Sequence, residues 1–320
     1  MKEIIVSNQE AEQRFDKMLG KYLNQAPKSF IYKMLRKKNI KLNGKKATGN
    51  EKLVMGDQIN IYLSDDTVAK FRKEVTVAKQ KVSLDVIYQD TNVMFINKPY
   101  GMLSQKSKPE DISINDEILP YCMEHGILTQ KDIQMMKPSI CNRLDRNTTG
   151  IIIAGISLEG LQTMAQMLKE RTIDKYYLTI VKGVITKKEQ ISGYLVKNHK
   201  TNKVTVSPQA KDGADPIETS YDPRKNNGEY TLLRVKLITG KTHQIRAHLA
   251  SQGHPIVGDS KYGDEEINRK MKQLFSLKHQ LLHCEELVFP EEMKRLKELE
   301  GKHIKARVPE NFQKIIDILF

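Results

Sequence analysis

The chain of 320 residues has no tryptophan, only three cysteines and few aromatic residues, 6% in all. Its cysteines, Cys122, Cys141 and Cys284, are odd in number and widely spaced, so they form neither a disulfide framework nor a Cys-x-x-Cys metal site. This usage fits a reducing compartment, and we expect a cytoplasmic protein. The uncharged run 147–158 is too short to cross a bilayer, and the first residues lack the apolar core of a signal peptide, so we expect no membrane association.

Acidic residues are also scarce relative to basic ones. Lys and Arg number 53 against 39 Asp and Glu, which gives a formal net charge of +14 and favours a polyanionic partner such as nucleic acid. The imbalance is greatest in residues 28–46, which contain eight Lys or Arg and no Asp or Glu. A basic helix face is often only solvated surface, but eight cations without a counter-charge favour phosphate contact. Lys33, Arg36 and Lys37 are the candidate contacts.

The first sixty residues predict a small unit of their own. Apolar residues in 12–24 follow helical spacing, Pro27 ends that helix, and a second helix follows it. The pair Asn43-Gly44 then predicts a tight hairpin, with strand-like residues up to Leu63. We therefore expect a helix–helix–hairpin domain at 1–63. Residues 64–81 lose hydrophobic periodicity, and we predict a linker there.

The remaining residues, 82–320, predict one larger domain. Strand patterns at 84–88, 93–97, 176–181 and 231–238 are interrupted by helical stretches near 113–125 and 158–170. Strands and helices do not alternate strictly. The pattern favours an α+β fold, with a mixed and mainly antiparallel sheet flanked by helices.

One polar turn in this domain stands out. Asp145 lies between Arg143 and Arg146, and the turn leads directly into three isoleucines, 151–153, which read as a short buried strand. A carboxylate anchored at the edge of a dry interior is suited to catalysis. Taken alone, the same string is more typical of a solvated turn in which Asp145 pairs with neighbouring arginines.

Four motifs occur together in the larger domain: Lys98-Pro-x-Gly after a strand, Arg143-Leu-Asp-Arg before one, Lys175-x-Tyr177, and Thr239-Gly-Lys-Thr-His-Gln-Ile-Arg246. In this order and at these spacings the chain resembles the RluA-type family of RNA pseudouridine synthases. The N-terminal unit resembles the αL RNA-binding module of a small-subunit ribosomal protein, through the opening at Arg14–Leu19, the basic second helix and the Asn-Gly-Lys turn.

The resemblance implies isomerisation of uridine in RNA to pseudouridine, with no cofactor and no metal. It assigns Asp145 as the essential carboxylate, Arg246 as the cation that keeps it charged, and Tyr177 as the residue that stacks on the base. Breaking a glycosidic bond develops positive charge on the sugar, which a carboxylate stabilises or traps. Because burial disfavours an ionised carboxyl, a nearby cation is required. Tyr177 and its neighbour Tyr176 should face opposite sides of their strand.

The further candidates for binding RNA are Arg143, Lys98, Lys241 and His243, as phosphate or pocket-wall groups. His243, His248 and His254 lack the spacing of three or four that would place them on one helix face, so we expect no metal site. Asn142 stands where the family usually has His, which removes a group able to carry charge.

RNA is the expected partner. Large-subunit ribosomal RNA is favoured because related synthases with this front module often act there; transfer RNA stays open, and a monomer is the default. The competing hypotheses are a non-catalytic RNA-binding or ribosome-assembly factor on the same scaffold, and a nucleoside glycosidase.

Overall fold

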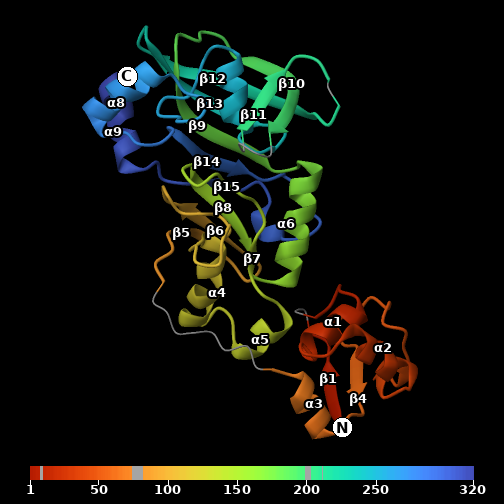
Figure 1. Cartoon of the computed structure of the whole chain (residues 1–320). Helices are drawn as coiled ribbons and strands as arrows, with labels where there is room; N and C mark the ends of the chain where they lie inside the picture. The colour runs from red at the N-terminus through yellow and green to blue at the C-terminus, as the bar shows by residue number, and fades with distance from the viewer. Residues whose placement is uncertain (8–9, 74–81, 199–202, 211) are drawn as a thin grey trace.

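The computed structural model describes residues 1–7, 10–73, 82–198, 203–210 and 212–320. Two separate sheets organise these residues, one of four strands near the N-terminus and one of eleven strands in the rest of the chain. Figure 1 shows the smaller unit at one end of the molecule, next to helix α5 (Gln130–Met135). The fold is α+β with a large mixed sheet, as predicted from the sequence.

The N-terminal unit packs two helices on the four-stranded sheet. Helix α1 (Phe15–Tyr22) buries Phe15, Met18 and Leu19 completely, so the predicted apolar face is the one that packs. Helix α2 (Lys28–Arg36) buries its apolar side and leaves its basic side exposed. The sheet has the order β1-β4-β2-β3 and consists of β1 (Lys2–Ile5), β2 (Ile40–Leu42), β3 (Lys45–Lys46) and β4 (Gln58–Ile61).

The predicted hairpin is present between β2 and β3. Asn43 and Gly44 both have positive φ, +50° and +72°, which is the requirement of a type I′ turn. Strand β1, which pairs with β4, was not predicted from the sequence.

The predicted linker at 64–81 is wrong in its first half. Residues 65–71 form helix α3 (Asp65–Phe71), in which the Ser64 side chain accepts a hydrogen bond from the Thr67 amide at the N-terminus. Val68 is buried, and the Phe71 ring lies 4.4 Å from that of Phe30 in α2. A helix of seven residues shows too few turns for its periodicity to be recognised. Residues 74–81 lie outside the described part of the chain.

The large sheet is antiparallel throughout its described pairs except one. Its order is β11-β10-β12-β13-β9-β14-β8-β6-β5, with β15 on β14 and β7 on β8, and only β14 and β8 run parallel. The strands are β5 (Val86–Gln89), β6 (Val93–Lys98), β7 (Ser139–Ile140), β8 (Thr149–Gly155), β9 (Asp174–Lys182), β10 (Glu189–Asn198), β11 (Lys203–Ser207), β12 (Asp215–Asn226), β13 (Tyr230–Leu237), β14 (Leu282–Val288) and β15 (His303–Lys305).

Helices cover this sheet at its middle and at its ends (Figure 1). Both helical stretches predicted from the sequence are present, as α4 (Ile114–Glu124) and α6 (Leu158–Glu170), and α6 packs on β8. Near the C-terminus, α8 (Glu265–Phe275) and α9 (Glu310–Leu319) bury Met271, Phe312 and Ile315 against residues of β9 and β13. This domain also contains α7 (Gln244–Ser251) and the short 3-10 helix η1 (Lys297–Leu299). No helix in the described residues is both long and apolar enough to cross a membrane.

Strand β8 is central to this architecture. All seven of its residues are buried, and it lies between β6 and β14 directly after the Asp145 turn. Gly150 has φ +104°, and a Cβ there would lie 2.1 Å from the carbonyl oxygen of Cys284 in β14. The contact between β8 and β14 therefore requires glycine at this position.

We expect Gly150→Ala to lower the free energy of unfolding by about 3 kcal/mol or more, because the alanine meets both an unfavourable φ and a backbone collision. Gly228→Ala is the matched control, since Gly228 has φ +88° with nothing within 4 Å of the added Cβ. That change should cost about 1 kcal/mol. Urea unfolding of both variants checks the difference, and equal losses would contradict the packing argument.

Candidate active site

The turn that carries Asp145 is held by hydrogen bonds on both sides of the aspartate. The Ser104 hydroxyl donates to the Leu144 carbonyl at 2.7 Å and accepts from the Leu144 amide at 3.0 Å. The Thr148 amide donates to the Asp145 carbonyl at 3.1 Å. The backbone is therefore fixed, while the Asp145 side chain keeps 25% of its surface exposed. A solvated turn with Asp145 paired to adjacent arginines, the alternative left open by the sequence, is not what the structure shows.

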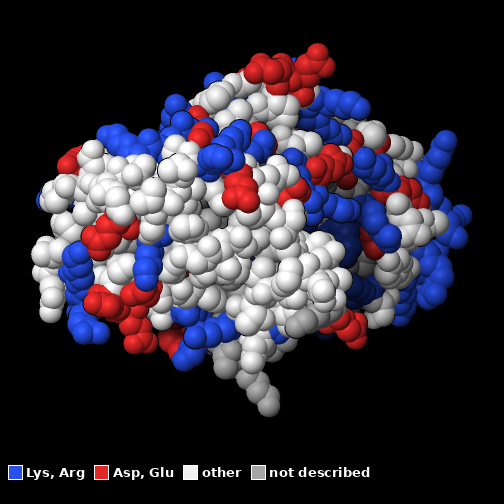
Figure 2. All heavy atoms as spheres, turned by 90° about the horizontal axis from the view of Figure 1, so that it is seen from above, with Lys and Arg blue, Asp and Glu red and all other residues white. Residues whose placement is uncertain are grey.

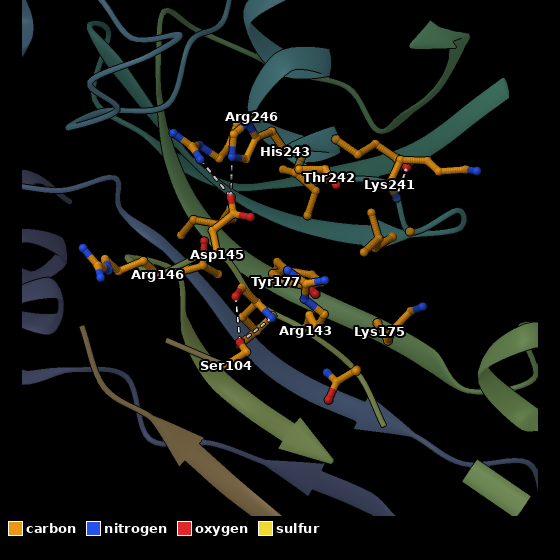
Figure 3. Close-up of a pocket in the computed structure, with 18 of the residues that line it drawn as sticks. Ser104, Arg143, Asp145, Arg146, Lys175, Tyr177, Lys241, Thr242, His243 and Arg246 are labelled. Atoms are coloured by element: carbon orange, nitrogen blue, oxygen red, sulfur yellow. Dashed lines mark hydrogen bonds and ion pairs between the residues drawn. The ribbon is translucent and has the colours of Figure 1, made fainter. Parts of the chain in front are cut away.

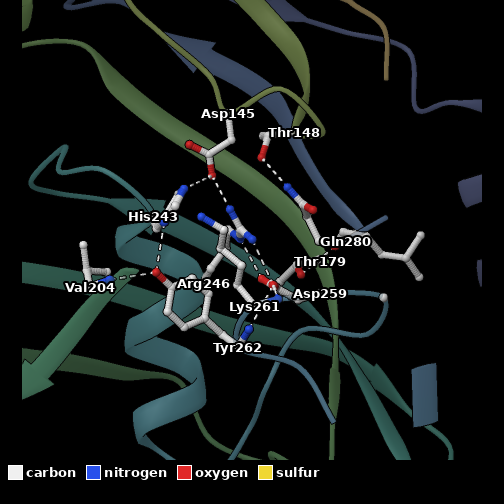
Figure 4. Close-up of polar contacts among 12 residues, drawn as sticks. Asp145, Thr148, Thr179, Val204, His243, Arg246, Asp259, Lys261, Tyr262 and Gln280 are labelled. Atoms are coloured by element: carbon white, nitrogen blue, oxygen red, sulfur yellow. Dashed lines mark hydrogen bonds and ion pairs between the residues drawn. The ribbon is translucent and has the colours of Figure 1, made fainter. Parts of the chain in front are cut away.

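The partner of Asp145 comes from a distant helix. Nη1 of Arg246 in α7 donates to Oδ2 of Asp145 at 2.8 Å, although the two residues are 101 positions apart. The opposite edge of the guanidinium binds Asp259, through Nε at 2.6 Å and Nη2 at 2.9 Å. Arg246 is thus a buried cation between two carboxylates (Figure 4). Its contact with Asp145 is the one that the resemblance implied.

Asp259 was not predicted as part of the site. Its side chain is fully buried, and its Oδ1 also accepts hydrogen bonds from the amides of Lys261 and Tyr262. Burial alone would raise the pKa of Asp259, but the hydrogen bonds and charge of Arg246 lower it below the ordinary value. Burial likewise opposes the charge of Arg246, while Asp259 and Asp145 raise its pKa above the usual arginine value. The sequence carries no local signal for Asp259, because the loop that holds it reads as an ordinary glycine-rich turn.

Helix α7 is held in place by a polar contact with strand β12. The side-chain Nε2 of Gln244 donates to the carbonyl of Glu218 at 3.0 Å and to the hydroxyl of Thr219 at 3.1 Å. The side-chain Oε1 of Gln244 accepts from the Thr239 hydroxyl and the Lys241 backbone amide. These bonds fix the first turn of α7, two residues before Arg246.

Tyr177 lies on β9 beside Cys284 of β14 and is almost fully buried. Burial raises the pKa of its hydroxyl well above 10, and the hydrogen bond with Cys284 adds to that shift, so Tyr177 keeps its proton. Its neighbour Tyr176 faces the other side of the sheet, with the Arg234 guanidinium 3.6 Å from its ring centre. The predicted opposition of the two tyrosines is confirmed.

Asp145, Tyr177 and Arg246 line one pocket with a volume of about 1010 Å³. Figure 3 shows Asp145 between Arg246 and His243 on one side and Tyr177 on the other. The predicted residues Arg143, Lys241 and His243 also line this pocket. Lys175, on β9, lines it too, and burial lowers its pKa. The pocket therefore has a carboxylate near its centre and several cations on its walls.

Lys98 is placed differently from the prediction of a phosphate or pocket-wall group. It is fully buried, and its Nζ donates to the carbonyls of Pro99, Met102 and Arg146 at 3.1, 2.9 and 2.8 Å. Burial lowers its pKa to about 7, an effect that Asp145 opposes. Three carbonyl acceptors match the three donors of an ammonium group, which favours the charged form. Lys98 ties the Asp145 turn to the loop after β6 and is not among the residues that line the pocket.

The three candidate cations of the N-terminal unit do not lie in the pocket. Lys33, Arg36 and Lys37 are exposed on and just after α2, and they form no ion pair within the described residues. Figure 2 shows one face of the molecule, where Lys and Arg gather around a hollow and along the right edge. Figure 2 differs from Figure 1 by a turn about the horizontal axis, which leaves left and right unchanged. The right edge of Figure 2 is therefore the side on which Figure 1 places the N-terminal unit.

Asn142 has a structural role. Its Oδ1 accepts from the Ile153 amide at 2.7 Å and its Nδ2 donates to the Ile151 carbonyl at 3.2 Å, so both ends of the amide bind β8. A residue used in this way supplies no proton to the pocket. Within the described residues, no three His, Cys, Asp or Glu side chains are arranged to hold a metal ion.

Comparison with known proteins identifies the class of enzyme to which these features belong. A family model described as RNA pseudouridylate synthase matches residues 92–251, which include the Asp145 turn, Tyr177 and Arg246. The ribosomal large subunit pseudouridine synthase C of Escherichia coli K12 is 30% identical over 90% of this chain and 88% of that protein. The enzyme of the same name from Buchnera aphidicola (subsp. Schizaphis graminum) is 28% identical over 99% of this chain and 96% of that protein.

A solved structure, human RNA pseudouridylate synthase domain containing 4, shares the fold with a TM-score of 0.59 and 24% identity, covering 73% of this chain and 92% of that one. The chain belongs to the RNA pseudouridylate synthase family. It is therefore an isomerase whose substrate is RNA, as the sequence predicted.

The contact between Arg246 and Asp259 gives a testable expectation. Asp259→Asn should lower the free energy of unfolding by about 3 kcal/mol, because it removes one partner of a buried ion pair. Asp215→Asn is the matched control: Asp215 pairs with Lys241 at 2.5 Å but is 52% exposed. Its loss should stay below about 1 kcal/mol.

Acid unfolding separates the charge effect from packing. Because the pKa of Asp259 lies below its ordinary 3.8 in the folded chain, its contribution is complete above pH 3.8 and is lost as the pH falls further. The difference in stability between wild type and Asp259→Asn should therefore shrink below that pH. A difference independent of pH would show that the ion pair does not cause the effect.

Proposed function

We propose that this enzyme converts specific uridines of large-subunit ribosomal RNA to pseudouridine, with Asp145 as the catalytic carboxylate. The observation that carries the assignment is the contact of Asp145 with the buried Arg246, inside a pocket that also holds Tyr177. The RNA target is favoured by the names of the relatives, which act on the large ribosomal subunit. Transfer RNA is the second candidate substrate.

The proposed roles follow from the charges. Detachment of uracil develops positive character on the ribose, and an adjacent carboxylate stabilises or traps it. Arg246 donates a hydrogen bond to Oδ2 of Asp145 and so fixes one of its two oxygens. Oδ1 of Asp145 forms no hydrogen bond within the described residues and is available to the substrate. Tyr177, whose hydroxyl keeps its proton, is suited to stack on the base.

Access to the pocket requires that the uridine leave its stack, at a cost of a few kcal/mol. Cations on the pocket walls, Arg143 and Lys241, are suited to bind the phosphates on either side of the flipped nucleotide. The exposed cations of α2 are suited to bind RNA farther away. We infer an RNA-binding domain that extends to Phe71 and includes α3, followed by a catalytic domain at 82–320. The proposed compartment is the cytoplasm and the proposed state a monomer.

Pseudouridine mapping tests the target. Total RNA from a strain that lacks the gene should miss one or a few pseudouridines in large-subunit ribosomal RNA, and expression of the wild-type gene should restore them. Missing sites in transfer RNA alone would overturn the assignment of the target and leave the reaction class intact.

We expect Asp145→Asn to lower kcat by roughly a thousandfold or more, while RNA affinity changes only a few-fold. Asp111→Asn is the matched control, because Asp111 lies 3.9 Å from Arg146 of the same turn and lines no part of the pocket. It should retain activity. An active Asp145→Asn enzyme would overturn the assignment of Asp145, and RNA binding without isomerisation by wild type would favour the non-catalytic alternative.

Neutralising Lys33, Arg36 and Lys37 with glutamine should weaken RNA binding and flatten its salt dependence. Each lost phosphate contact reduces the slope of log affinity against log salt by about 0.7 to 0.9, so three contacts reduce it by about 2 to 3. Filter binding over a range of salt concentrations measures the slope.

The control variant neutralises Arg269, Lys272 and Lys314, which are exposed on α8 and α9 and change the net charge equally. Its slope should match that of wild type. Equal slopes in all three proteins would exclude phosphate contact by α2.

A further inference from the structure

A short gap without a direct hydrogen bond separates His243 from the proposed catalytic carboxylate. Nε2 of His243 lies 3.9 Å from Oδ2 of Asp145, which is too long for a hydrogen bond (Figure 4). A hydroxyl oxygen about 2.8 Å from each atom would lie about 2 Å to the side of the line that joins them, where it can bridge the two. The same Oδ2 already accepts from Arg246, so the gap lies beside the fixed oxygen and leaves Oδ1 open.

A hydrogen-bond chain determines which nitrogen of His243 carries the proton. The Val204 amide in β11 donates to the Tyr262 hydroxyl at 3.0 Å, and that hydroxyl lies 2.9 Å from Nδ1 of His243. The Tyr262 hydroxyl has no acceptor other than Nδ1 within the described residues, so we assign its hydrogen to Nδ1, which is then the acceptor. The neutral imidazole consequently carries its hydrogen on Nε2, facing Asp145.

The charge states agree with this arrangement. Burial raises the pKa of Tyr262, so its hydroxyl retains the hydrogen that it donates. Burial lowers the pKa of His243, an effect larger than the opposing influence of Asp145, so the ring is neutral. Tyr262 accepts one hydrogen and donates one, and His243 can do the same.

The donor is also held rigidly. His243 has φ +55°, a left-handed conformation that a non-glycine residue adopts at a cost, and its side chain is only 8% exposed. The ring of Tyr262 packs edge-on against it at 5.7 Å and lies 5.3 Å from the Arg246 guanidinium. Such a residue is suited to place one hydrogen at a defined point.

We propose that this gap binds the 2′-hydroxyl of the target ribose. His243 Nε2 donates to the 2′-oxygen, and the 2′-hydroxyl donates to Oδ2 of Asp145. A group that both donates and accepts is required at this point, and the 2′-hydroxyl is the group that distinguishes RNA from DNA. His243 would thus be a specificity residue of the active site. This inference rests on the proposed role of Asp145.

The test compares two forms of one synthetic RNA oligonucleotide of the mapped target sequence, with uridine or 2′-deoxyuridine at the target position. Wild type should prefer uridine in kcat/KM by roughly ten- to a hundredfold. His243→Asn tolerates the left-handed backbone but is too short to reach the gap, and its preference should fall to about threefold or less. Any intrinsic effect of the 2′-hydroxyl on reactivity is common to both enzymes and cancels when the two preferences are compared.

Two further variants exclude a merely structural role. His243→Gln can place an amide donor near the position of Nε2 and should restore part of the preference. Lys241→Met alters another residue of the pocket wall and should lower kcat/KM on both oligonucleotides equally, leaving the preference that of wild type.

An unchanged preference in an active His243→Asn enzyme would overturn the inference and show that the gap holds only water. In that case Asp145→Asn would still be inactive on the uridine oligonucleotide, so the proposed function would stand. If the wild-type enzyme failed to convert the uridine oligonucleotide, both the proposed function and the inference about His243 would be overturned.

Discussion

A single buried guanidinium connects the parts of this active site. Arg246 binds Asp145 with one edge and Asp259 with the other, and so joins the turn before β8, helix α7 and the loop before α8. An arginine held by two carboxylates cannot rotate away from either, because each contact fixes a different edge of a planar group. The Asp145 carboxylate lies next to this cation, and a carboxylate is suited to the positive character that develops on a ribose as its base departs.

The scaffold supplies this arrangement through close backbone approaches. Gly150 lets β8 lie against β14 where the Asp145 turn ends. Gly258, immediately before Asp259, has φ +82°, and a Cβ there would lie 2.3 Å from the His279 carbonyl oxygen. Lys98 binds three carbonyls from beneath the turn, and Ser104 binds Leu144 beside it. These contacts of the surrounding residues hold the turn in place, in addition to the hydrogen bonds that Asp145 itself accepts from Arg246 and Thr148.

The sequence predicted those features whose signal is local or belongs to a motif. The three isoleucines of β8 predict a buried strand, and the alternation of side chains along β9 places Tyr176 and Tyr177 on opposite faces. The motif that ends at Arg246 implies, through the family resemblance, the cation that contacts Asp145. Asp259 escaped prediction because its significance depends on a contact across the fold, and nothing in a glycine-rich loop marks a buried carboxylate. Lys98 was predicted to be a phosphate or pocket-wall group because lysine is rarely buried, so that exposure is the usual expectation. Only three-dimensional proximity identifies the carbonyls that make its burial tolerable.

The distribution of charge explains how an acidic centre operates in a basic protein. RNA phosphates would be repelled by Asp145 and Asp259, but these carboxylates are screened by Arg246 and lie inside the pocket, whereas Arg143 and Lys241 line its walls. Coulomb interactions weaken with distance and are further screened in water, so a phosphate at the walls is governed by the nearer cations. Under the proposed function, a ribose in the pocket would instead meet the carboxylate at short range. The proposed roles are then compatible: the wall cations would attract the phosphates of a nucleotide, and Asp145 would stabilise the positive character of its sugar.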